Sequence, residues 1–572
     1  MSTYGSYLNN AYLFIIIIIL TFKIMVLGKR NVLQLLKIFT FTKSKRKVSP
    51  TLLVECLEEI LSHLVQDRSS LYSCLFVNRL FCRLTIPILW QNPFEYQNKS
   101  GSRLIRTYVS CLDDNQKKLL LDNGLKVPDL PKPFFDYPKY MQGFDFFHFS
   151  EAVEKWVEGN YWSMPPFLIR NMKFIEQLIG NMLFSRSIGL ENFRYYRGFR
   201  NIIDYQYFTD IKLYTGFTHS LSKLRTFEFQ AFSYRDINSF TAWSDLFENI
   251  SISTKTIEHL SLFIPHKAHN NKQLCLSLSK LIRSQTNLKS LIIDELTALF
   301  IFDALTSQAQ YLTFLRVTWL SKFDLLYQLL PICSKLEALE FSQVSQPDSG
   351  INDSKFQITQ INLRNLYCVD DNPSQIMINT ILQMSNKYLS SLLLKNVTAE
   401  VLNTLELHCP KITHLCLKIS SKQLPNFIQL LSGLVLKHLS LENLPEEPRY
   451  ATEDIKLLAQ TIPLSLRYFG IKFHMSLTDF KSFCKECGAS LDAMALYYIP
   501  KMDVETLIST VKYSKHIPSL KYIKFGREVF KFYNSLAIND LEKVNKFKYT
   551  IGEAKSLNNR FYDMGIPIDM SF

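Results

Sequence analysis

Apolar residues recur in a short pattern along the second half of the chain. The pattern is L-x-x-L-x-L, with an aromatic residue, Ile, Val, Met or Cys allowed in the apolar places, and it is found twelve times. Its copies begin at Leu224, Ile257, Leu288, Leu312, Leu336, Leu363, Leu389, Ile412, Leu436, Leu466, Leu491 and Leu520. Successive copies begin 23 to 33 residues apart, with amphipathic stretches such as "LIRSQTN" between them. This spacing predicts an array in which each repeat contributes one short strand and one return helix.

A different apolar pattern, spaced for helices, occupies residues 49–93. Ser49 and Pro50 suit the first positions of a helix, and a stripe at i, i+3, i+4 and i+7 follows at Leu57, Ile60, Leu61 and Leu64. A second helix is expected from the cap Asp67 through Leu71, Cys74 and Leu75. A third is expected after Asn78-Arg79, through Leu80, Leu84 and Ile88 to Trp90. Three short helices bury little by themselves, so this module needs a partner or a neighbouring domain.

The module resembles the F-box. The matching residues run from the entry Leu52-Leu53-Val54-Glu55 to the distal Trp90, and two positions depart from the family pattern: Leu53 stands where Pro is usual, and Phe81 where Trp is usual. The resemblance implies binding to a SKP1-like adaptor and, through it, to a cullin-based ubiquitin ligase. The adaptor-binding residues that it implies are Leu52, Leu53, Leu57, Ile60, Leu61, Leu64, Leu71, Cys74, Val77, Asn78, Arg79, Phe81, Leu84 and Trp90. The alternative is that these helices form the first layer of the next domain's core.

The repeats resemble leucine-rich repeats of the irregular kind that is often joined to an F-box. Cys333 and Cys409 in particular precede strand patterns in the manner of that class. The fold class expected is therefore α/β: an N-terminal three-helix F-box followed by a leucine-rich-repeat solenoid of alternating short parallel strands and helices. Another alternating strand-helix fold is the alternative. The Asn that usually follows the strand is mostly absent, which leaves the turn geometry open.

In such a solenoid the apolar places of the pattern point inward, and the places between them line the concave sheet where partners bind. These outward places are rich in Tyr and His, residue types that suit protein recognition. The substrate-binding residues expected on this surface are His259, Arg316, Glu340, Tyr367, His414, His438, Tyr468, Tyr522 and Lys524.

Residues 94–220 form a mixed connecting region. "RLIRTYVSCLDDNQKKLLL" predicts an amphipathic helix, and the prolines at 128, 131, 133 and 138 exclude helix after it. That stretch could be a Pro-rich peptide ligand. The many aromatic residues beside the prolines, from Phe134 to Phe149, favour a loop packed on the body instead. No chemistry can be assigned to this region.

The first 48 residues form a basic segment with an apolar run at 11–28. A helix over this run would be about 27 Å long, marginal for a single membrane span. The cationic flank after Lys29 would keep the rest of the chain in the cytoplasm. Alternatively, translation begins at Met25 and the run is an artefact of the assigned start codon. Either case places the body in the cytoplasm or nucleus, with a membrane tether possible through 11–28.

Charge and cysteine content narrow the remaining function classes. Residues 1–54 hold eight basic and no acidic residues. The rest of the chain therefore holds 57 of the 65 basic residues and 51 acidic residues, so its net charge is only +6. The basic balance therefore gives no indication of nucleic-acid binding. Eleven scattered cysteines indicate a reducing compartment. Cys484 and Cys487 are spaced like metal ligands but lack a second pair, and His266 and His269 lack the glutamate of a zinc protease.

No catalytic motif is present, so neither an enzyme activity, a cofactor nor a metal is expected. The leading hypothesis is a substrate-recognition subunit of a ubiquitin ligase built from SKP1, a cullin and an F-box protein. The domains expected are the basic segment at 1–48, the F-box at 49–93, the connecting region at 94–220, the solenoid at 221–540 and a tail at 541–572. One rival is a membrane-anchored leucine-rich-repeat scaffold without ligase coupling, with glycosylation sequons at Asn98, Asn249, Asn352 and Asn396. A second rival is an enzyme on another α/β fold.

Overall fold

The computed structural model describes residues 53–553 with gaps, and the chain divides into two compact units. The gaps are residue 66 and residues 96–100, 126, 128–130, 161–164, 198–213, 232–236, 265–270, 296–298, 321–322, 345–358, 371–373, 445–448, 499–502, 537–543 and 545–549. Unit 1 comprises Met1–Ala268 with Ser284–Thr286, and unit 2 comprises His269–Arg283 with Asn287–Phe572. The predicted membrane span at 11–28 lies outside the described residues. Among the helices that are described, none has the length and hydropathy needed to cross a bilayer.

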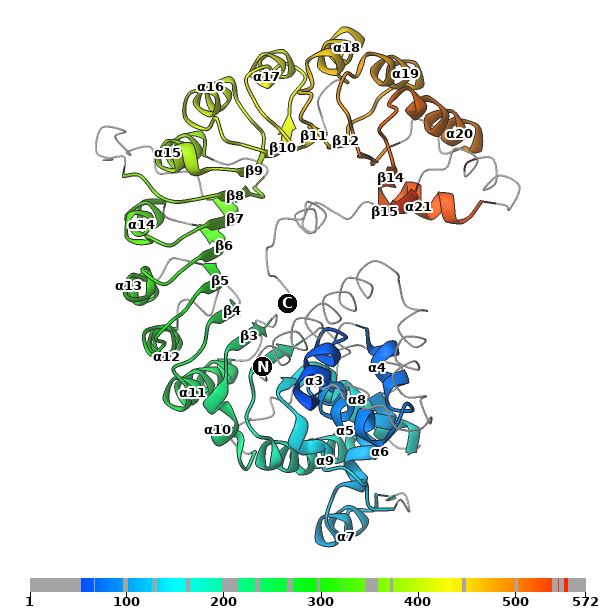
Figure 1. Ribbon diagram of the computed structural model, residues 1–572. Helices are drawn as coiled ribbons and strands as arrows, with labels where there is room; N and C mark the ends of the chain where they lie inside the picture. Colours follow the sequence, from blue (N-terminus) through cyan, green and yellow to red (C-terminus); the bar gives the residue numbers. More distant parts are fainter. Residues whose placement is uncertain are drawn as a thin grey trace, which may run out of the picture. The chain divides into compact units, whose positions relative to one another are not determined.

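Unit 1 begins with three short helices, α3 (Val54–Ser62), α4 (Arg68–Cys74) and α5 (Arg79–Leu89) (Figure 1). As the sequence predicts, Asp67 caps α4 by accepting from the Ser70 amide. Asn78 caps α5 by accepting from the Phe81 amide at 2.9 Å. The three helices enclose one small core of Leu57, Leu61, Leu64, Leu71, Cys74 and Phe81. The Asn78-Arg79 pair therefore marks a helix start between two apolar helices.

The rest of unit 1 alternates helices with parallel strands. Its helices are α6 (Gly101–Ser110), α7 (Asp114–Asp122), α8 (Phe146–Asn160), α9 (Pro165–Arg186), α10 (Phe217–Ser220) and α11 (Ile237–Ser253). Its strands are β1 (Gly143–Asp145), β2 (Asn192–Arg197), β3 (Thr226–Ala231) and β4 (His259–Phe263). Each strand pairs in parallel with the next, with Phe193 level with Phe227. The parallel ladder thus begins before residue 221, inside the stretch that the sequence pattern assigned to a connecting region.

Aromatic residues fill the inward places of strand β2. The inward places of β2 are Phe193 and Tyr195, whose rings stack on Phe227 and Phe229 of β3 with interplanar angles of 8° and 7°. Leu190-x-x-Phe193-x-Tyr195 also fits the pattern, which already allows aromatic residues in these places, so this strand could have been predicted. The aromatic-rich stretch is largely packed on the body, because Phe144 and Phe149 are buried, although Phe134 is 85% exposed.

Unit 2 is a longer array of the same kind. Its strands are β5 (Ser290–Glu295), β6 (Phe314–Leu320), β7 (Ala338–Val344), β8 (Asn365–Cys368), β9 (Ser391–Lys395), β10 (His414–Ile419), β11 (His438–Asn443), β12 (Tyr468–Lys472), β13 (Ala493–Leu496), β14 (Tyr522–Phe525) and β15 (Thr550–Glu553). Its helices are α12 (Lys272–Arg283), α13 (Leu299–Gln308), α14 (Phe323–Leu329), α15 (Gln375–Ser385), α16 (Ala399–His408), α17 (Leu424–Leu431), α18 (Thr452–Thr461), α19 (Leu477–Glu486), α20 (Val504–Tyr513) and α21 (Arg527–Asn534).

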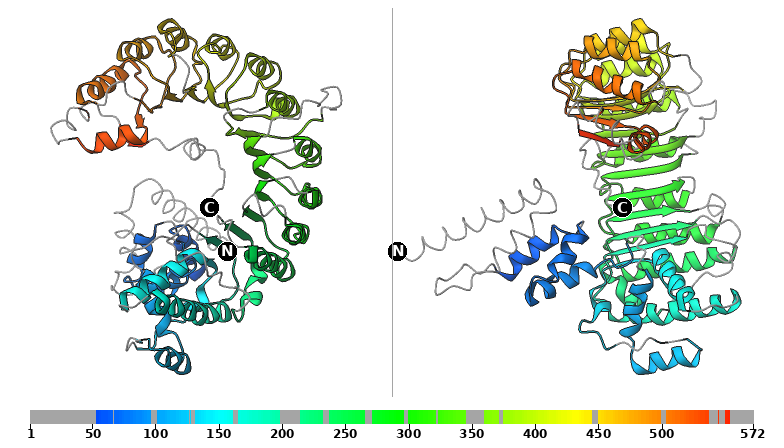
Figure 2. Two further views of the ribbon diagram at one scale, coloured as in Figure 1. Left: turned by 180° about the vertical axis from the view of Figure 1, so that it is seen from behind. Right: turned by 90° about the vertical axis from the view of Figure 1, so that its right-hand side faces the viewer.

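Neighbouring strands of unit 2 are parallel throughout, and α12 to α20 cover one face of the sheet (Figures 1 and 2). The twelve predicted strands are all confirmed, since each begins two residues after the start of one copy of the pattern. Strand β15, in the stretch expected to be a tail, pairs with β14 and was not predicted. The leucine-rich-repeat solenoid expected from the sequence is the observed fold.

The apolar places of the pattern stack into a continuous core. One inward place of each strand from β5 to β14 has no exposed surface: Leu291, Leu315, Leu339, Leu366, Leu392, Leu415, Leu439, Phe469, Met494 and Ile523. Burying a side chain of this size stabilises the fold by about 1.5–3 kcal/mol. Because the inward side chains of each repeat are buried partly by its neighbours, the array is stable only as a whole.

Backbone hydrogen bonds fix the register between repeats without the usual Asn. At each strand entry, one carbonyl of the preceding repeat accepts from two successive amides. The Ser390 carbonyl accepts from Thr413 and His414, and the Thr413 carbonyl accepts from Lys437 and His438, at 2.8–3.0 Å. This repeated two-donor arrangement sets which outward side chains become neighbours on the open face.

Candidate functional site

The three-helix module carries a cluster of large apolar side chains on its surface. Leu53, Val54 and Leu80 are exposed, as are Tyr72 and Phe76 of the α4 region, at 60% and 75%. The rings of Tyr72 and Phe76 meet edge to face with centroids 5.5 Å apart. We call these five residues the module's apolar face. So much exposed apolar area on a small unit is typical of a surface that binds another protein.

Most of the adaptor-binding residues expected from the sequence lie beneath this face. Leu57, Ile60, Leu61, Leu64, Leu71, Cys74 and Phe81 are buried in the module. Val77 and Leu84 are partly buried and pack against that core. Only Leu53, Asn78 and Arg79 of the expected set are exposed, and Leu52 lies outside the described residues. The expected residues therefore build the module, and few of them offer surface to a partner.

The residues that sequence reasoning missed are Val54, Tyr72, Phe76 and Leu80. A signal for them exists, because Tyr72 and Phe76 are four residues apart and follow the helical period directly beside the buried Leu71 and the partly buried Leu75. A helix with apolar residues on two adjacent faces must bury one of them against another chain or domain.

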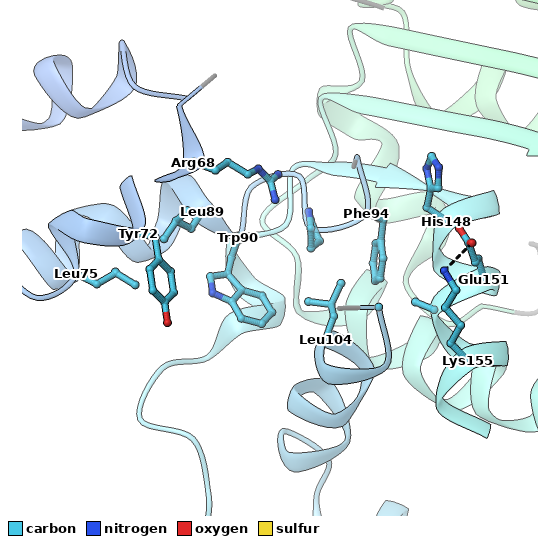
Figure 3. A pocket seen from close by; sticks show the side chains of 13 residues that line it. Arg68, Tyr72, Leu75, Leu89, Trp90, Phe94, Leu104, His148, Glu151 and Lys155 are labelled. Atoms are coloured by element: carbon cyan, nitrogen blue, oxygen red, sulfur yellow. Dashed lines mark hydrogen bonds and ion pairs between the residues drawn. The ribbon is translucent and has the colours of Figure 1, made fainter. Parts of the chain in front are cut away.

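Trp90, the last residue of the expected set, faces the rest of unit 1. Its ring packs on Tyr137 with centroids 4.1 Å apart and on Tyr108 at 5.4 Å. It also lines a pocket of about 310 Å³ between the module and α6 and α8 (Figure 3). The remaining lining residues are Arg68, Tyr72, Leu75, Leu89, Pro93, Phe94, Gly101, Leu104, His148, Glu151, Ala152 and Lys155.

The charged side chains that line this pocket form ion pairs and hydrogen bonds with residues close to them. Lys155 lies 2.7 Å from Glu151, and His148 lies 3.0 Å from the buried Asp145. Arg68 donates to the Asn92 carbonyl at 2.9 Å. These cations and carboxylates are therefore already paired with one another or with the backbone.

The expected substrate-binding residues fall into separate groups on the outward face of the strands. His259 lies on β4 in unit 1. Arg316 and Glu340 lie opposite each other on β6 and β7 and form an ion pair of 2.7 Å. His414, His438 and Tyr468 are level on β10, β11 and β12. Tyr522 and Lys524 lie on β14, and the Lys524 ammonium is 5.6 Å from the centre of the Tyr468 ring.

Two of the expected surface residues are buried, which corrects the expectation that they are available to a partner. Tyr367 is 1% exposed, because it sits level with Glu340 on one side and Leu393 on the other. This burial raises the pKa of its phenol well above the usual range. His438 is 6% exposed, because its ring lies between His414 and Tyr468.

His414 remains partly exposed at the end of this stack. Burial lowers the pKa of its imidazole, and the positive charge of Lys437 lowers it further. Its Nδ1 lies 2.9 Å from the Thr413 hydroxyl. The ring is therefore held in place and favours the neutral form.

A row of charged residues beyond the rings was missed from the sequence. Lys395, Lys418, Glu442 and Lys472 are level on β9, β10, β11 and β12. The Lys472 ammonium lies 2.6 Å from the Glu442 carboxylate. The pattern gives no signal for this row, because its members are 23 to 30 residues apart and become neighbours only through strand register.

Within the residues that the structure describes, no three His, Cys, Asp or Glu side chains could hold a metal ion together. Cys484 and Cys487 are free thiols whose pKa is raised, chiefly by burial. His266 and His269 lie outside the described residues.

Comparison with known proteins supports no family assignment. No family model matches the sequence, and no curated protein matches it. Among solved structures, the leucine-rich-repeat protein LegL7 from Legionella pneumophila is 14% identical, with 48% of this chain and 85% of that chain covered and a TM-score of 0.32. A chain of the Rad7 and Elc1 complex in yeast is 16% identical, with 60% and 79% covered and a TM-score of 0.34.

A third solved structure, of the TLR13 complex with ssRNA13, is 13% identical, with 54% of this chain and 50% of that chain covered and a TM-score of 0.22. At such low TM-scores none of these likenesses bears on what this chain does. The parallel strand register itself defines the repeat fold.

Proposed function

We propose that this chain is the substrate receptor of a cullin-based ubiquitin ligase. The helical module binds a SKP1-like adaptor, and the solenoid binds a protein target. The observation that supports this best is the apolar face of Leu53, Val54, Tyr72, Phe76 and Leu80 on a module whose residues resemble an F-box. The cytoplasm or nucleus is the compartment that such a role requires.

The apolar face has the energetic character of an interface centre. Burying a side chain as large as Phe76 contributes about 1.5–3 kcal/mol, and aromatic anchors dominate binding energy at interfaces. Tyr72 adds a ring with a polar tip, which tolerates both solvent and an interface. The buried leucines beneath act indirectly, since they hold α3, α4 and α5 in the arrangement that presents these side chains.

The solenoid supplies the target-binding half of the proposal. Its strands present an open face of polar and aromatic side chains, the kind of surface on which repeat proteins bind partners. Since no catalytic group is proposed, the chain acts by raising the effective concentration of the target beside a bound ligase.

The test is affinity purification of the tagged full chain from cell extract. The wild-type chain should capture a SKP1-like adaptor and a cullin, and Phe76→Ser should lose both. Phe134→Ser is the matched control, because Phe134 is 85% exposed but lies outside the module. A core variant such as Leu61→Asp is unsuitable, since Leu61 is buried and its loss unfolds the module.

Two results would contradict the proposal: no adaptor captured by the wild-type chain, or equal capture by wild type and Phe76→Ser. The rival function, a membrane-anchored scaffold without ligase coupling, predicts the first result. It also predicts glycan on sequons such as Asn249 and Asn396, which mass spectrometry of the purified chain would detect.

A further inference from the structure

A row of small side chains crosses β10 to β13 on the open face of unit 2, and we call this row and the rows on either side of it the channel. Its floor is the row Cys416, Ser440, Gly470 and Ala495, which parallel register places side by side. These side chains are small, and adding a methyl group at Gly470 would bring it within 2.6 Å of the Ser440 hydroxyl oxygen. The row is therefore low and closely packed.

Two higher ridges border this floor. On one side lie the stacked rings of His414, His438 and Tyr468, and the same row continues with Ala493 on β13 and Tyr522 on β14. On the other side lies the row Lys395, Lys418, Glu442 and Lys472. A segment lying along the floor would have the edges of the stacked rings on one side and the lysine row, in which Lys418 is 8% exposed, on the other.

The charge of this channel is one-sided. The outward places of β9 to β14 include four lysines, Lys395, Lys418, Lys472 and Lys524, and one carboxylate, Glu442. The neighbouring outward face of β6 and β7 is balanced instead, because Arg316 pairs with Glu340 at 2.7 Å. The outward places of these six strands thus carry an excess of positive charge, with Lys472 paired to Glu442 at 2.6 Å and Lys418 8% exposed.

We propose that this channel binds an extended, acidic segment of the target protein. This proposal rests on the proposed function in one respect: it takes the solenoid as the part of the chain that binds the target. Carboxylates of the segment lie toward the lysine row, and its backbone and apolar side chains pack on the rings. The four strands of the floor, at about 4.8 Å spacing, span about 14 Å, which corresponds to about four extended residues.

Fluorescence anisotropy on the full chain tests this directly. The probe is a fluorescein-labelled (Glu-Ala)5 peptide, with (Lys-Ala)5 as the charge-reversed control. The acidic probe should bind and its affinity should fall with added salt, while the basic probe should not bind. Lys395→Gln with Lys472→Gln should weaken binding of the acidic probe about tenfold, because two charge-assisted contacts are lost.

Lys411→Gln is the matched control, because Lys411 is exposed on unit 2 but lies outside the strands of the channel. It should change the affinity by less than about twofold. Equal binding of both probes, or an unchanged affinity in the double variant, would overturn the proposal. Tighter binding by a peptide of residues 554–572 would also overturn it, since that peptide has no excess of acidic residues and would assign the channel to the chain's own segment.

The same variants separate this proposal from the ligase assignment. Phe76→Ser should bind the acidic probe like wild type, and the double lysine variant should capture the adaptor like wild type. If the adaptor is never captured but the acidic probe binds with the expected selectivity, the channel stands and the ligase proposal fails.

Discussion

His438 stacks on Tyr468 across two repeats, with ring centroids 3.9 Å apart and planes inclined by only 12°. Thirty residues separate them in the chain, and parallel register alone makes them neighbours. His414 extends the stack on the other side, with its ring centroid 5.9 Å from that of His438. The aromatic ridge of the channel is therefore also a structural joint between three repeats.

Replacing the outer ring of this joint should loosen it. Tyr468→Leu should lower the free energy of unfolding by about 1 kcal/mol, because stacked ring pairs contribute about 0.5–1.5 kcal/mol beyond the area they bury. Tyr468→Phe keeps the ring and should stay close to wild type. Urea denaturation followed by circular dichroism measures both, and equal stability of the Leu and Phe variants would show that the stack contributes nothing.

Acid should weaken the solenoid through His414. The pKa of this imidazole is lowered from 6.5 in the folded state, by burial first and by Lys437 second. Between the lowered pKa and 6.5, the unfolded chain binds more protons than the folded one, so stability falls as pH falls through this window.

His414→Gln should flatten this dependence. Glutamine does not titrate and can still reach the Thr413 hydroxyl. The charged or titratable groups near His414 are Lys437 and His438. Urea midpoints between pH 7.5 and 5 provide the measurement. His516→Gln, at an exposed position, is the matched control. A His414→Gln profile as steep as that of wild type would mean that other groups cause the acid sensitivity.

The channel floor should not tolerate a larger residue at position 470. A β-carbon there meets the Ser440 hydroxyl oxygen at 2.6 Å and the Ser440 β-carbon at 3.2 Å. Gly470→Ala should therefore lower the free energy of unfolding by about 1–3 kcal/mol. In the Ser440→Ala background the loss should be smaller, because the closer atom is gone. Strictly additive effects of the two substitutions would contradict the close contact.

In unit 1, a half-buried ion pair should matter more than an exposed one. Arg194 donates from Nε and Nη2 to the two oxygens of Glu228 at 2.8 and 3.0 Å, and it also lies 3.5 Å from the buried Asp145. Arg194→Lys should cost about 1–2 kcal/mol, because a lysine cannot make the two-pronged contact. Lys521→Met, which breaks the exposed pair with Asp492, should leave the unfolding midpoint unchanged.

The repeat core could be predicted because the inward residues of each repeat follow the same local spacing. Leu-x-x-Leu-x-Leu places leucines two and three residues apart, and those spacings match a strand entering a core. Strand β2 was missed although Leu190, Phe193 and Tyr195 fit the same pattern as the copy at Leu224. Strand β15 was missed because its segment lacks the leading leucine, although Ile551 lies level with Ile523.

The functional surfaces were harder to predict, for two different reasons. The F-box pattern marks residues such as Leu61 and Leu71, which are buried inside the module, so it says little about Phe76 on the outside. The channel depends on cross-strand neighbours such as Lys472 and Glu442, and no local spacing encodes them. Outward side chains can also bury one another, as they do at Tyr367. How far they do so depends on the sizes of the side chains in adjacent repeats.

Titration of the purified chain with a purified SKP1-like adaptor, by isothermal titration calorimetry, tests the central claim most directly. The account predicts a 1:1 complex with a negative heat-capacity change, as burial of an apolar face requires. Phe76→Ser should weaken it at least about tenfold, since burying this ring contributes about 1.5–3 kcal/mol, while Phe134→Ser should leave it unchanged. No heat of binding for the wild-type chain, or equal affinity for Phe76→Ser, would contradict the account.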